Sequence, residues 1–508
     1  MRGGTTSRKT ARRRSSAVAN RRRIANRPTR RTRVGRIPNP CYVDAMHLVL
    51  LVLLTITAAS AAGDEEKRTD ALFERFTKAS PGCAVGAMRD GKILFSRGYG
   101  VADLEHNVAI SPASVFYLAS VSKQFLAFAV LLLEQQGKLS RADLIGKHLP
   151  GLPPHTARVT LQQLLHHTGG VRDYLTLGMM AGFSPDHVWT ERAALEWISR
   201  QQALNFEPGT EHLYSNSGYV LLSLAAQRVT GGRLQEWMKA NVYGPLGMNS
   251  SRWQHDHRDP VERRAHGYNL GPGGQGWKIS DSLLDTIGDG GMYSSVEDLL
   301  RWAANFDTRK LGAQLLDAMA KPGLLAGNVA IANGYGMGLA KGSYRGLETI
   351  VHGGGLGGYR TMFFRVPSRS FTVICLCNNG TANPGEFAQR TADIWLDGQF
   401  PRPVPEAPKP TQIAKQPEMM VVSSEIRQAI TGRWWSDELA AVYRFYDDNG
   451  KFTLAIGDAE PIEVGGAAGG LLRARGLELT PVRSGDRVTG IMLGAGRVRG
   501  ILLRRLFQ

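Results

Sequence analysis

Apolar residues recur along most of the chain in blocks that predict short strands and helices, but two stretches break this pattern. Residues 1–40 contain almost no large apolar side chains. Residues 401–418 hold six prolines, which is typical of an extended, semi-rigid linker. The pattern therefore predicts four regions. They are a basic segment with a signal peptide (1–62), a large domain (64–400), a linker (401–424) and a C-terminal domain (425–508).

Strand signals stand at both ends of the large region. Residues 83–88 and 93–95 flank an Asp-Gly pair, which predicts a hairpin. Residues 349–352 and 371–376 are strand-like near the other end. Helical patterns fill the space between, so we expect an α/β fold with one antiparallel sheet whose N- and C-terminal strands pair. After the linker, short alternating runs with Gly and Asp turns predict a small antiparallel β-domain.

One helix stands out among these patterns. It is predicted to run from Ser120 to Gln136 and to stop at Gly137, a residue suited to the position just past a helix end. Its residues are apolar almost all round, which is typical of a helix buried on every side. We therefore expect this helix at the centre of the large domain.

The net charge of +18 invites a nucleic-acid interpretation, but its distribution argues against one. Residues 1–40 carry 14 Lys or Arg and no acidic residue, and outside them 48 basic residues face 44 acidic ones. The nearly balanced remainder gives no sign of a basic face that would follow phosphates, so no nucleic-acid partner is expected. The basic segment alone leaves one alternative open, binding to nucleic acid or to anionic lipid.

An apolar run at residues 46–56 ends in small residues at 58–63 and is followed by acidic ones. The run is too short to span a bilayer comfortably, and the layout is that of a secretory signal peptide. We therefore expect an exported protein, periplasmic or secreted. The alternative is an uncleaved segment that anchors the chain to the inner membrane or associates with it transiently.

The four cysteines are too few to indicate a disulfide framework. Cys41 lies in the segment expected to be removed, and Cys83, Cys375 and Cys377 lie in apolar runs that predict strands. Buried free thiols are therefore expected. Cys375 and Cys377 alternate with one leucine, so on a strand they would share one face.

The first candidate for chemistry is the run Ser-Val-Ser-Lys at residues 120–123. At this spacing on a helix, Ser120 and Lys123 lie on one face. Ser120 would sit in the first turn, where the helix dipole favours developing negative charge. An amine beside a hydroxyl in a water-poor cleft can take the proton of the serine. By itself the motif also fits a helix start with a serine cap and an exposed lysine.

Two further motifs follow in the chain. Tyr214 and Asn216 lie on a loop before an apolar helix, where a phenol can shuttle a proton and an amide can hold a carbonyl group. His352 closes a strand and precedes Gly354 and Gly355, and such glycines let a substrate approach the backbone closely. Each motif alone also fits a structural role, as a packed tyrosine or as a glycine-rich turn.

Together the three motifs are far more specific. Ser-x-x-Lys on an apolar helix, then Tyr-x-Asn, then a strand-borne His-x-Gly, in this order, resemble the motif set of serine β-lactamases and penicillin-binding proteins. The chain resembles the branch of class C β-lactamases and S12 peptidases, which includes esterases, D-aminopeptidases and DD-peptidases. The resemblance covers roughly residues 72–398. It implies a sheet flanked by helices, an all-α subdomain and a lipocalin-like C-terminal β-domain.

The resemblance also implies roles for single residues. Ser120 attacks and becomes acylated, Lys123 and Tyr214 share the general base and acid roles, and Asn216 orients the substrate. Which of Lys123 and Tyr214 takes the serine proton stays open. Other matching segments, among them residues 164–170 and 290–295, are interpreted as turns that determine the fold.

For the third motif, the resemblance implies roles in substrate binding. The backbone N–H groups of Ser120 and Gly355 would form the oxyanion hole, and Gly354 is the last glycine of the motif. His352 stands where many β-lactamases have a lysine that meets the carboxylate of a penicillin. A neutral histidine supplies that charge poorly near pH 7, and Arg360 is a candidate to compensate.

The predicted function is therefore a serine hydrolase for small-molecule or peptide substrates. Esters, amides and D-amino-acid peptides are favoured over β-lactams, and no cofactor is expected. Two alternatives remain: a protein that is only acylated by penicillin and never turns over, and a metal hydrolase. For the second, His255 and His257 lie on one side of a predicted strand, but no third ligand is evident nearby.

Overall fold

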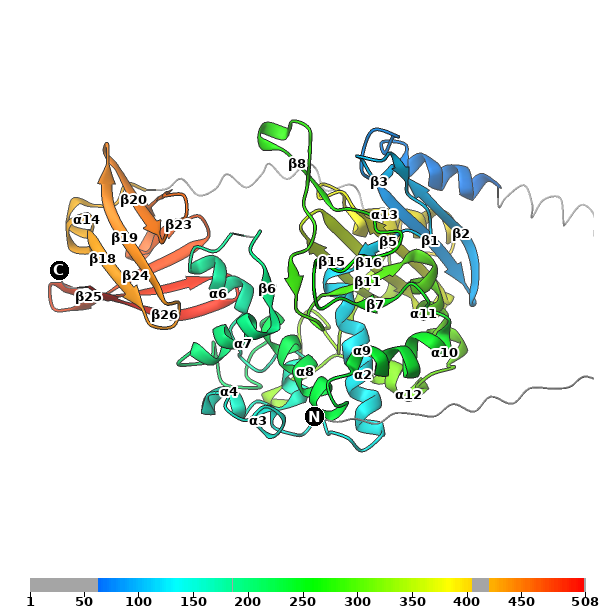
Figure 1. Cartoon of the computed structure of the whole chain (residues 1–508), viewed down its shortest axis with the longest axis horizontal. Coiled ribbons are helices and arrows are strands. Elements are labelled where there is room, and N and C mark those ends of the chain that lie inside the picture. Colours follow the sequence, from blue (N-terminus) through cyan, green and yellow to red (C-terminus); the bar gives the residue numbers. More distant parts are fainter. Residues whose placement is uncertain (1–62, 185, 404–419, 507–508) are drawn as a thin grey trace, which may run out of the picture. The chain divides into compact units, whose positions relative to one another are not determined.

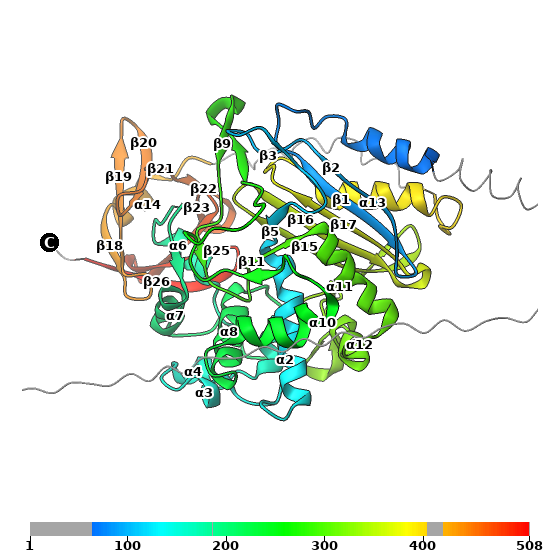
Figure 2. The same cartoon turned by 45° about the vertical axis from the view of Figure 1, so that its right-hand side comes forward.

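A computed structural model describes residues 63–184, 186–403 and 420–506 (Figures 1 and 2). They belong to one compact unit, Ala61–Gln508. The predicted basic segment and signal peptide, at residues 1–62, lie outside the described residues, as does most of the linker. Among the helices that are described, none is both long and apolar enough to cross a membrane.

A six-stranded sheet forms the centre of the large domain, with the strand order β14-β15-β16-β17-β1-β2 and antiparallel pairing throughout. Its strands are β1 (Cys83–Arg89), β2 (Lys92–Tyr99), β14 (Ala340–Tyr344), β15 (Leu347–Leu356), β16 (Tyr359–Val366) and β17 (Phe371–Cys377). The predicted hairpin is confirmed, since Asp90 and Gly91 join β1 to β2 with the positive φ angles of a tight turn. Because β1 also pairs with β17, the expected closure between the N- and C-terminal strands is confirmed.

The sheet has a helical layer on each face (Figure 2). Strand β1 is almost completely buried, and its alternating side chains serve both layers. Val85 and its same-face neighbours pack with Phe73, from the helix at residues 63–73, and with Phe387 of α13 (Pro384–Trp395). Ala84 and Met88 face the opposite core, which contains α2 (Lys123–Gln135) and α11 (Val296–Thr308).

The central helix differs from its prediction at one end. The chain first forms a 3-10 turn, η1 (Ala119–Ser122), and α2 begins only at Lys123. Ala119 has a φ of 47°, and this left-handed residue bends the backbone sharply after β5 (Val115–Tyr117). Ser120 therefore sits in a tight turn that leads into the helix. As predicted, α2 is buried on nearly every side.

The remaining helices gather mostly in a helical subdomain beside α2, which confirms the expected all-α part. They are α3 (Ile145–His148), α4 (Pro154–Ala157), α5 (Leu161–Leu165), α6 (Tyr174–Met180), α7 (Glu191–Arg200), α8 (Asn216–Val229), α9 (Leu234–Met238), α10 (Gly244–Leu246) and α12 (Ala313–Ala320). A small sheet of β5, β11 (Met292–Ser295) and β7 (Arg252–Trp253) connects this part to η1. Short pairs complete the domain: β3 (Val101–Asp103) with β4 (Val108–Ala109), β6 (Trp189–Thr190) with β10 (Leu284–Asp285), β8 (Tyr268–Leu270) with β9 (Trp277–Ile279), and β12 (Leu324–Leu325) with β13 (Val329–Ala330).

The C-terminal part is an antiparallel nine-stranded sheet with one helix, α14 (Ser424–Ile430), which confirms the predicted β-domain. Its strands are β18 (Gly432–Ser436), β19 (Ala441–Asp448), β20 (Lys451–Ile456), β21 (Ile462–Glu463), β22 (Gly465–Gly466), β23 (Leu472–Ala474), β24 (Leu477–Ser484), β25 (Arg487–Ala495) and β26 (Val498–Arg505). Alternate residues of these strands point into one apolar core, as the period of two requires.

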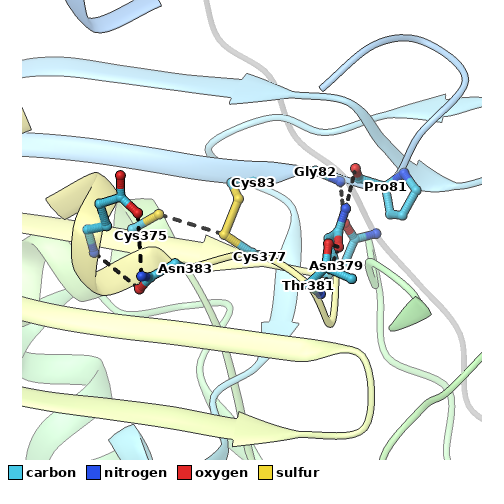
Figure 3. The surroundings of a disulfide bond; sticks show 10 residues. Pro81, Gly82, Cys83, Cys375, Cys377, Asn379, Thr381 and Asn383 are labelled. Atoms are coloured by element: carbon cyan, nitrogen blue, oxygen red, sulfur yellow. Dashed lines mark hydrogen bonds between the residues drawn. A yellow bond between two sulfur atoms is a disulfide. The ribbon is translucent and has the colours of Figure 1, made fainter. Parts of the chain in front are cut away.

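The expectation of free thiols was wrong for two of the three described cysteines. Cys83 and Cys377 form a disulfide between β1 and β17 (Figure 3). They are 294 residues apart in sequence but stand directly opposite each other in the strand register, which no local pattern reveals. Cys375 stays free, and its sulfur lies 3.7 Å from that of Cys377 because the two share one face of β17, as predicted.

Candidate active site

The turn that carries Ser120 is fixed from both sides. The N–H of Leu118 donates to the carbonyl of Met292 on β11 (2.8 Å), and the carbonyl of Leu118 accepts from the hydroxyl of Thr361 on β16 (2.8 Å). These bonds tie η1 to two sheets and orient the strained turn at Ala119. Ser120 is thus held in a fixed place while its own side chain stays partly exposed.

Lys123 lies beside this serine and is completely buried. Its Nζ donates to Ser120 Oγ (3.2 Å), to Asn216 Oδ1 (2.9 Å) and to the backbone carbonyl of Asp289 (2.5 Å). Three acceptors match the three donors that a lysine side chain can offer. The lysine is therefore oriented entirely by polar groups around the serine, although the rest of its helix is apolar.

Tyr214 and Asn216 reach the same place from the start of α8. The N–H of Asn216 donates to Asp173 Oδ2 (2.7 Å), which fixes the first turn of that helix. The centre of the Tyr214 ring lies 4.9 Å from Lys123 Nζ. The Tyr214 hydroxyl is buried, and within the described residues it has no hydrogen-bond partner, so the protein leaves its donor and acceptor unused.

His167 is a neighbour of this site that the sequence argument interpreted only as part of a turn. Its ring lies 4.1 Å from the Tyr214 ring, centre to centre, and its Nδ1 accepts the N–H of Ser215 (3.2 Å). Burial, with a smaller effect of Lys123, lowers the pKa of His167 well below its usual value. A neutral imidazole therefore supports the face of the tyrosine and fixes the loop that carries it.

Strand β15 closes the site on the other side of the serine. A Cβ atom on Gly354 would lie 2.4 Å from the carbonyl oxygen of Leu118, 2.4 Å from the hydroxyl of Thr361 and 3.1 Å from the backbone N of Ser120. Only glycine allows this approach between the strand and η1. The strand therefore lies against the backbone of the turn that carries the serine, and Gly355, the predicted second oxyanion donor, follows directly.

His352 precedes these glycines and is neutral at pH 7. Burial, and secondly the charge of Lys123, lower its pKa to about 4. Its Nδ1 lies 2.7 Å from the carbonyl of Gly353 and its Nε2 lies 3.3 Å from the hydroxyl of Tyr335. The first contact requires a proton on Nδ1, so Nε2 accepts from Tyr335. This histidine provides no positive charge, in agreement with the sequence argument.

Arg360, the predicted substitute for that charge, is occupied by its own strand connection. Its Nη1 donates to the carbonyls of Gly357 (2.9 Å) and Tyr359 (2.7 Å). For the metal alternative, the structure brings Asp285 of β10 to His257, with 3.0 Å between the carboxylate and the ring nitrogen. Asp256, His257 and Asp285 thus place three possible ligand atoms within 4.8 Å of one another, whereas the predicted His255 does not join this group.

The structure thus brings five predicted residues together in one site: Ser120, Lys123, Tyr214, Asn216 and His352. The sequence argument missed the carbonyl of Asp289, although its neighbours at 290–295 were recognised as a matching segment. A hydroxyl beside an amine, a free phenol and an amide is suited to nucleophilic attack on a carbonyl group. These groups match the parts that acyl transfer requires.

Comparison with known proteins shows to which family the chain belongs. The model of the Beta-lactamase family matches residues 69–394, which is more than half of the chain. The chain belongs to the Beta-lactamase family. The match spans η1, α8 and β15, so the three motifs lie inside the family domain, and it supports the predicted serine-hydrolase class. The nine-stranded C-terminal sheet lies outside it.

Individual proteins related to this family also resemble the chain in sequence or in fold. Penicillin-binding protein 4* of Bacillus subtilis is 29% identical over 360 residues, which cover 68% of this chain and 79% of that protein. A D-aminopeptidase of Gluconobacter oxydans is 28% identical over 329 residues, which cover 64% of this chain but only 60% of the relative. The octameric penicillin-binding protein homologue from Pyrococcus abyssi shares the fold with a TM-score of 0.56 and 21% identity, over 84% of this chain and 96% of that one.

Proposed function

We propose that this protein hydrolyses esters, amides or peptides of D-amino acids through a covalent acyl-serine intermediate on Ser120. The observation that carries the proposal is the contact of 3.2 Å between Lys123 Nζ and Ser120 Oγ, with Asn216 and Asp289 orienting the amine. No group in the described part of the chain separates the serine from this amine, so proton transfer between them needs no rearrangement.

The proposed reaction has two halves. Ser120 Oγ attacks the substrate carbonyl carbon while its proton passes to Lys123 or Tyr214, and the N–H groups of Ser120 and Gly355 stabilise the oxyanion. Collapse of the tetrahedral species breaks the bond to the amine or alcohol, which leaves with that proton. A water molecule then attacks the ester on Ser120 and releases the acid, which restores the serine hydroxyl.

The proposed substrate class rests on the neutral state of His352 and on the substrates named for similar proteins. His352 is neutral, whereas many β-lactamases have a charged lysine at this position, which disfavours efficient β-lactam hydrolysis. Similar proteins include D-aminopeptidases, which act on D-amino-acid substrates by name. A protein that penicillin acylates without turnover remains the second candidate, because acylation uses the same residues as hydrolysis.

We test the mechanism with the Ser120→Ala variant of the whole chain. Loss of one partly exposed hydroxyl removes the nucleophile but little packing, so we expect turnover of a p-nitrophenyl ester to fall by about 1,000-fold or more in a folded protein. Intact-mass spectrometry with the ester and with a fluorescent penicillin would show an adduct only in the wild type. Ser122→Ala is the matched control, because that buried hydroxyl has no partner among the described residues.

The outcomes separate the two candidates. Ester turnover that depends on Ser120 and not on Ser122 supports the hydrolase. A stable penicillin adduct on Ser120 without ester turnover favours the protein that is only acylated. Full activity of a folded Ser120→Ala variant would contradict both.

We further propose that the protein is exported, because of the apolar run and the small residues at positions 46–63. Mass spectrometry of the mature protein from cells should place its first residue near Ala61 to Gly63. A mature protein that still begins at Met1 or Met46 would count against a cleaved signal peptide.

A further inference from the structure

A hairpin of the C-terminal β-domain reaches the proposed active site. Gly496 and Arg497 form the two-residue turn between β25 and β26, with Ala495 paired to Val498. The Arg497 guanidinium lies over the ring of Tyr214, with its central carbon 4.6 Å from the ring centre. A residue outside the family domain thus contacts a group proposed to act in catalysis.

The backbone of this turn is held in place. The side-chain amide of Asn205 donates to the carbonyl of Arg497 (2.9 Å) and accepts the N–H of Arg499 (2.8 Å). Next to it, Arg172 donates to the carbonyl of Gly500 (3.1 Å). Three hydrogen bonds from the catalytic domain therefore present Arg497 at one fixed position, as a site residue must be presented.

The guanidinium of Arg497 takes no part in these hydrogen bonds. Its nearest carboxylate oxygen, Asp173 Oδ2, lies 3.9 Å away and already accepts the N–H of Asn216. Within the described residues the Arg497 side chain donates no hydrogen bond, and 43% of it is exposed. Its fork of donors therefore faces the solvent beside Tyr214.

The other basic side chains near the site are buried, neutral or already hydrogen-bonded. Lys123 is completely buried and surrounded by three acceptors, His352 is neutral, and Arg360 donates to carbonyls of its own turn. Among these groups, Arg497 is the cation whose donors are open to a bound molecule. An arginine in this state is suited to a carboxylate, which it can bind with two parallel hydrogen bonds.

We propose that Arg497 binds a carboxylate carried by the leaving group of the substrate, so that the protein favours peptides with a free C-terminal carboxylate. This inference rests on the proposed function. Tyr214 is placed to return the proton to the departing nitrogen, and the α-carboxylate of a C-terminal residue is only two bonds from that nitrogen. The Arg497 guanidinium contacts the ring of Tyr214, 4.6 Å from its centre, so it lies close to the phenol that would protonate that nitrogen.

The test compares two substrates that differ in one charge, N-acetyl-D-alanyl-D-alanine and its C-terminal amide. We expect wild-type whole chain to cleave the acid with a kcat/KM at least 10-fold higher than that of the amide. In Arg497→Met the kcat/KM for the acid should fall by about 10- to 100-fold, mainly through KM, and that for the amide by less than 3-fold. Arg497→Lys should keep part of the preference, since it retains the charge but not the fork.

Arg499→Met is the matched control. Arg499 lies two residues away in the same hairpin but pairs with Glu211 (2.9 Å). We expect it to change neither kcat/KM by more than 2-fold. Equal losses on acid and amide in Arg497→Met, or no loss on either, would overturn the inference, because the residue would then act only on structure or not at all.

A binding measurement separates this inference from the proposed function. Failure of the wild type to turn over a p-nitrophenyl ester would refute the hydrolase but not the carboxylate site. Calorimetry with N-acetyl-D-alanyl-D-alanine on the Ser120→Ala protein then decides. The inference requires that adding Arg497→Met weaken the Kd at least 10-fold, and an unchanged Kd overturns it.

Discussion

Lys123 is a buried side chain whose surroundings, rather than its own helix, determine its role. The sequence places it one turn from Ser120, but its other two acceptors come from Asn216 and from the backbone of Asp289. Two buried histidines stand nearby, and burial together with the lysine lowers the pKa of each. Neither histidine therefore adds positive charge to the site, and the amine is positioned beside the serine by neutral acceptors.

The depressed pKa of His352 predicts a specific dependence of stability on pH. The unfolded chain protonates this residue near pH 6.5, whereas the folded protein resists protonation until about pH 4. Between these values the unfolded state binds more protons, so the free energy of unfolding falls as the pH falls. We expect His352 alone to account for a loss of about 2 kcal/mol between pH 7 and pH 5.

The measurement is chemical denaturation of the wild type and of His352→Gln at both pH values. The glutamine cannot be protonated in this range, so the variant should lose about 2 kcal/mol less than the wild type. His106→Gln, at a side chain that is 74% exposed, should lose as much as the wild type. An equal pH effect in His352→Gln and in the wild type would refute the explanation.

At the scale of elements, the approach of β15 to η1 determines the geometry around the serine. Gly354 permits it, since a side chain there would meet the carbonyl of Leu118 and the backbone N of Ser120. The sequence shows three consecutive glycines at 353–355 without telling which of them the fold needs. The structure distinguishes them, because a Cβ on Gly353 would come no closer than 3.5 Å to the Met362 side chain.

Gly354→Ala should therefore damage catalysis far more than Gly353→Ala. The added methyl group forces β15 away from η1 and displaces one oxyanion donor, and loss of such a donor typically costs about 100- to 1,000-fold in kcat. We expect a fall of that size in ester turnover for Gly354→Ala. Gly353→Ala, the matched control, should change kcat by less than about 3-fold. Similar activity of the two folded variants would show that the close approach is not required.

At the scale of the whole molecule, the C-terminal domain is packed on the catalytic domain through a buried ion pair. Arg172 pairs with Glu438, and their side chains are only 2% and 8% exposed. Glu438 also accepts the N–H of Gln202 (2.8 Å), and the hydroxyl of Tyr443 donates to the carbonyl of Met180. Since Arg172 also holds the hairpin of Arg497, this pair connects domain packing to the proposed substrate site.

Breaking this pair should strongly destabilise the protein. Arg172→Met leaves the Glu438 carboxylate buried without its partner, which typically costs about 3–5 kcal/mol. The denaturation midpoint in urea, followed by tryptophan fluorescence, should fall accordingly. In the double variant Arg172→Met, Glu438→Met no buried charge remains, so at least half of the loss should be recovered. A double variant as unstable as the single one would contradict this account.

The sequence by itself determined the features that depend on local order: the Asp-Gly hairpin, the apolar helix α2 and the β-domain after the linker. It proposed Ser120, Lys123, Tyr214, Asn216 and His352 as site residues through the resemblance to a known motif set, and the structure brings these five together. Periodicity and turn chemistry act over a few residues, so one chain is enough to reveal them. Only the tertiary structure decided that Cys83 meets Cys377, that Asp289 offers its carbonyl to Lys123, and that Arg497 lies over Tyr214. Each of these contacts joins segments about 160 to 295 residues apart, and packing of the complete core brings them together.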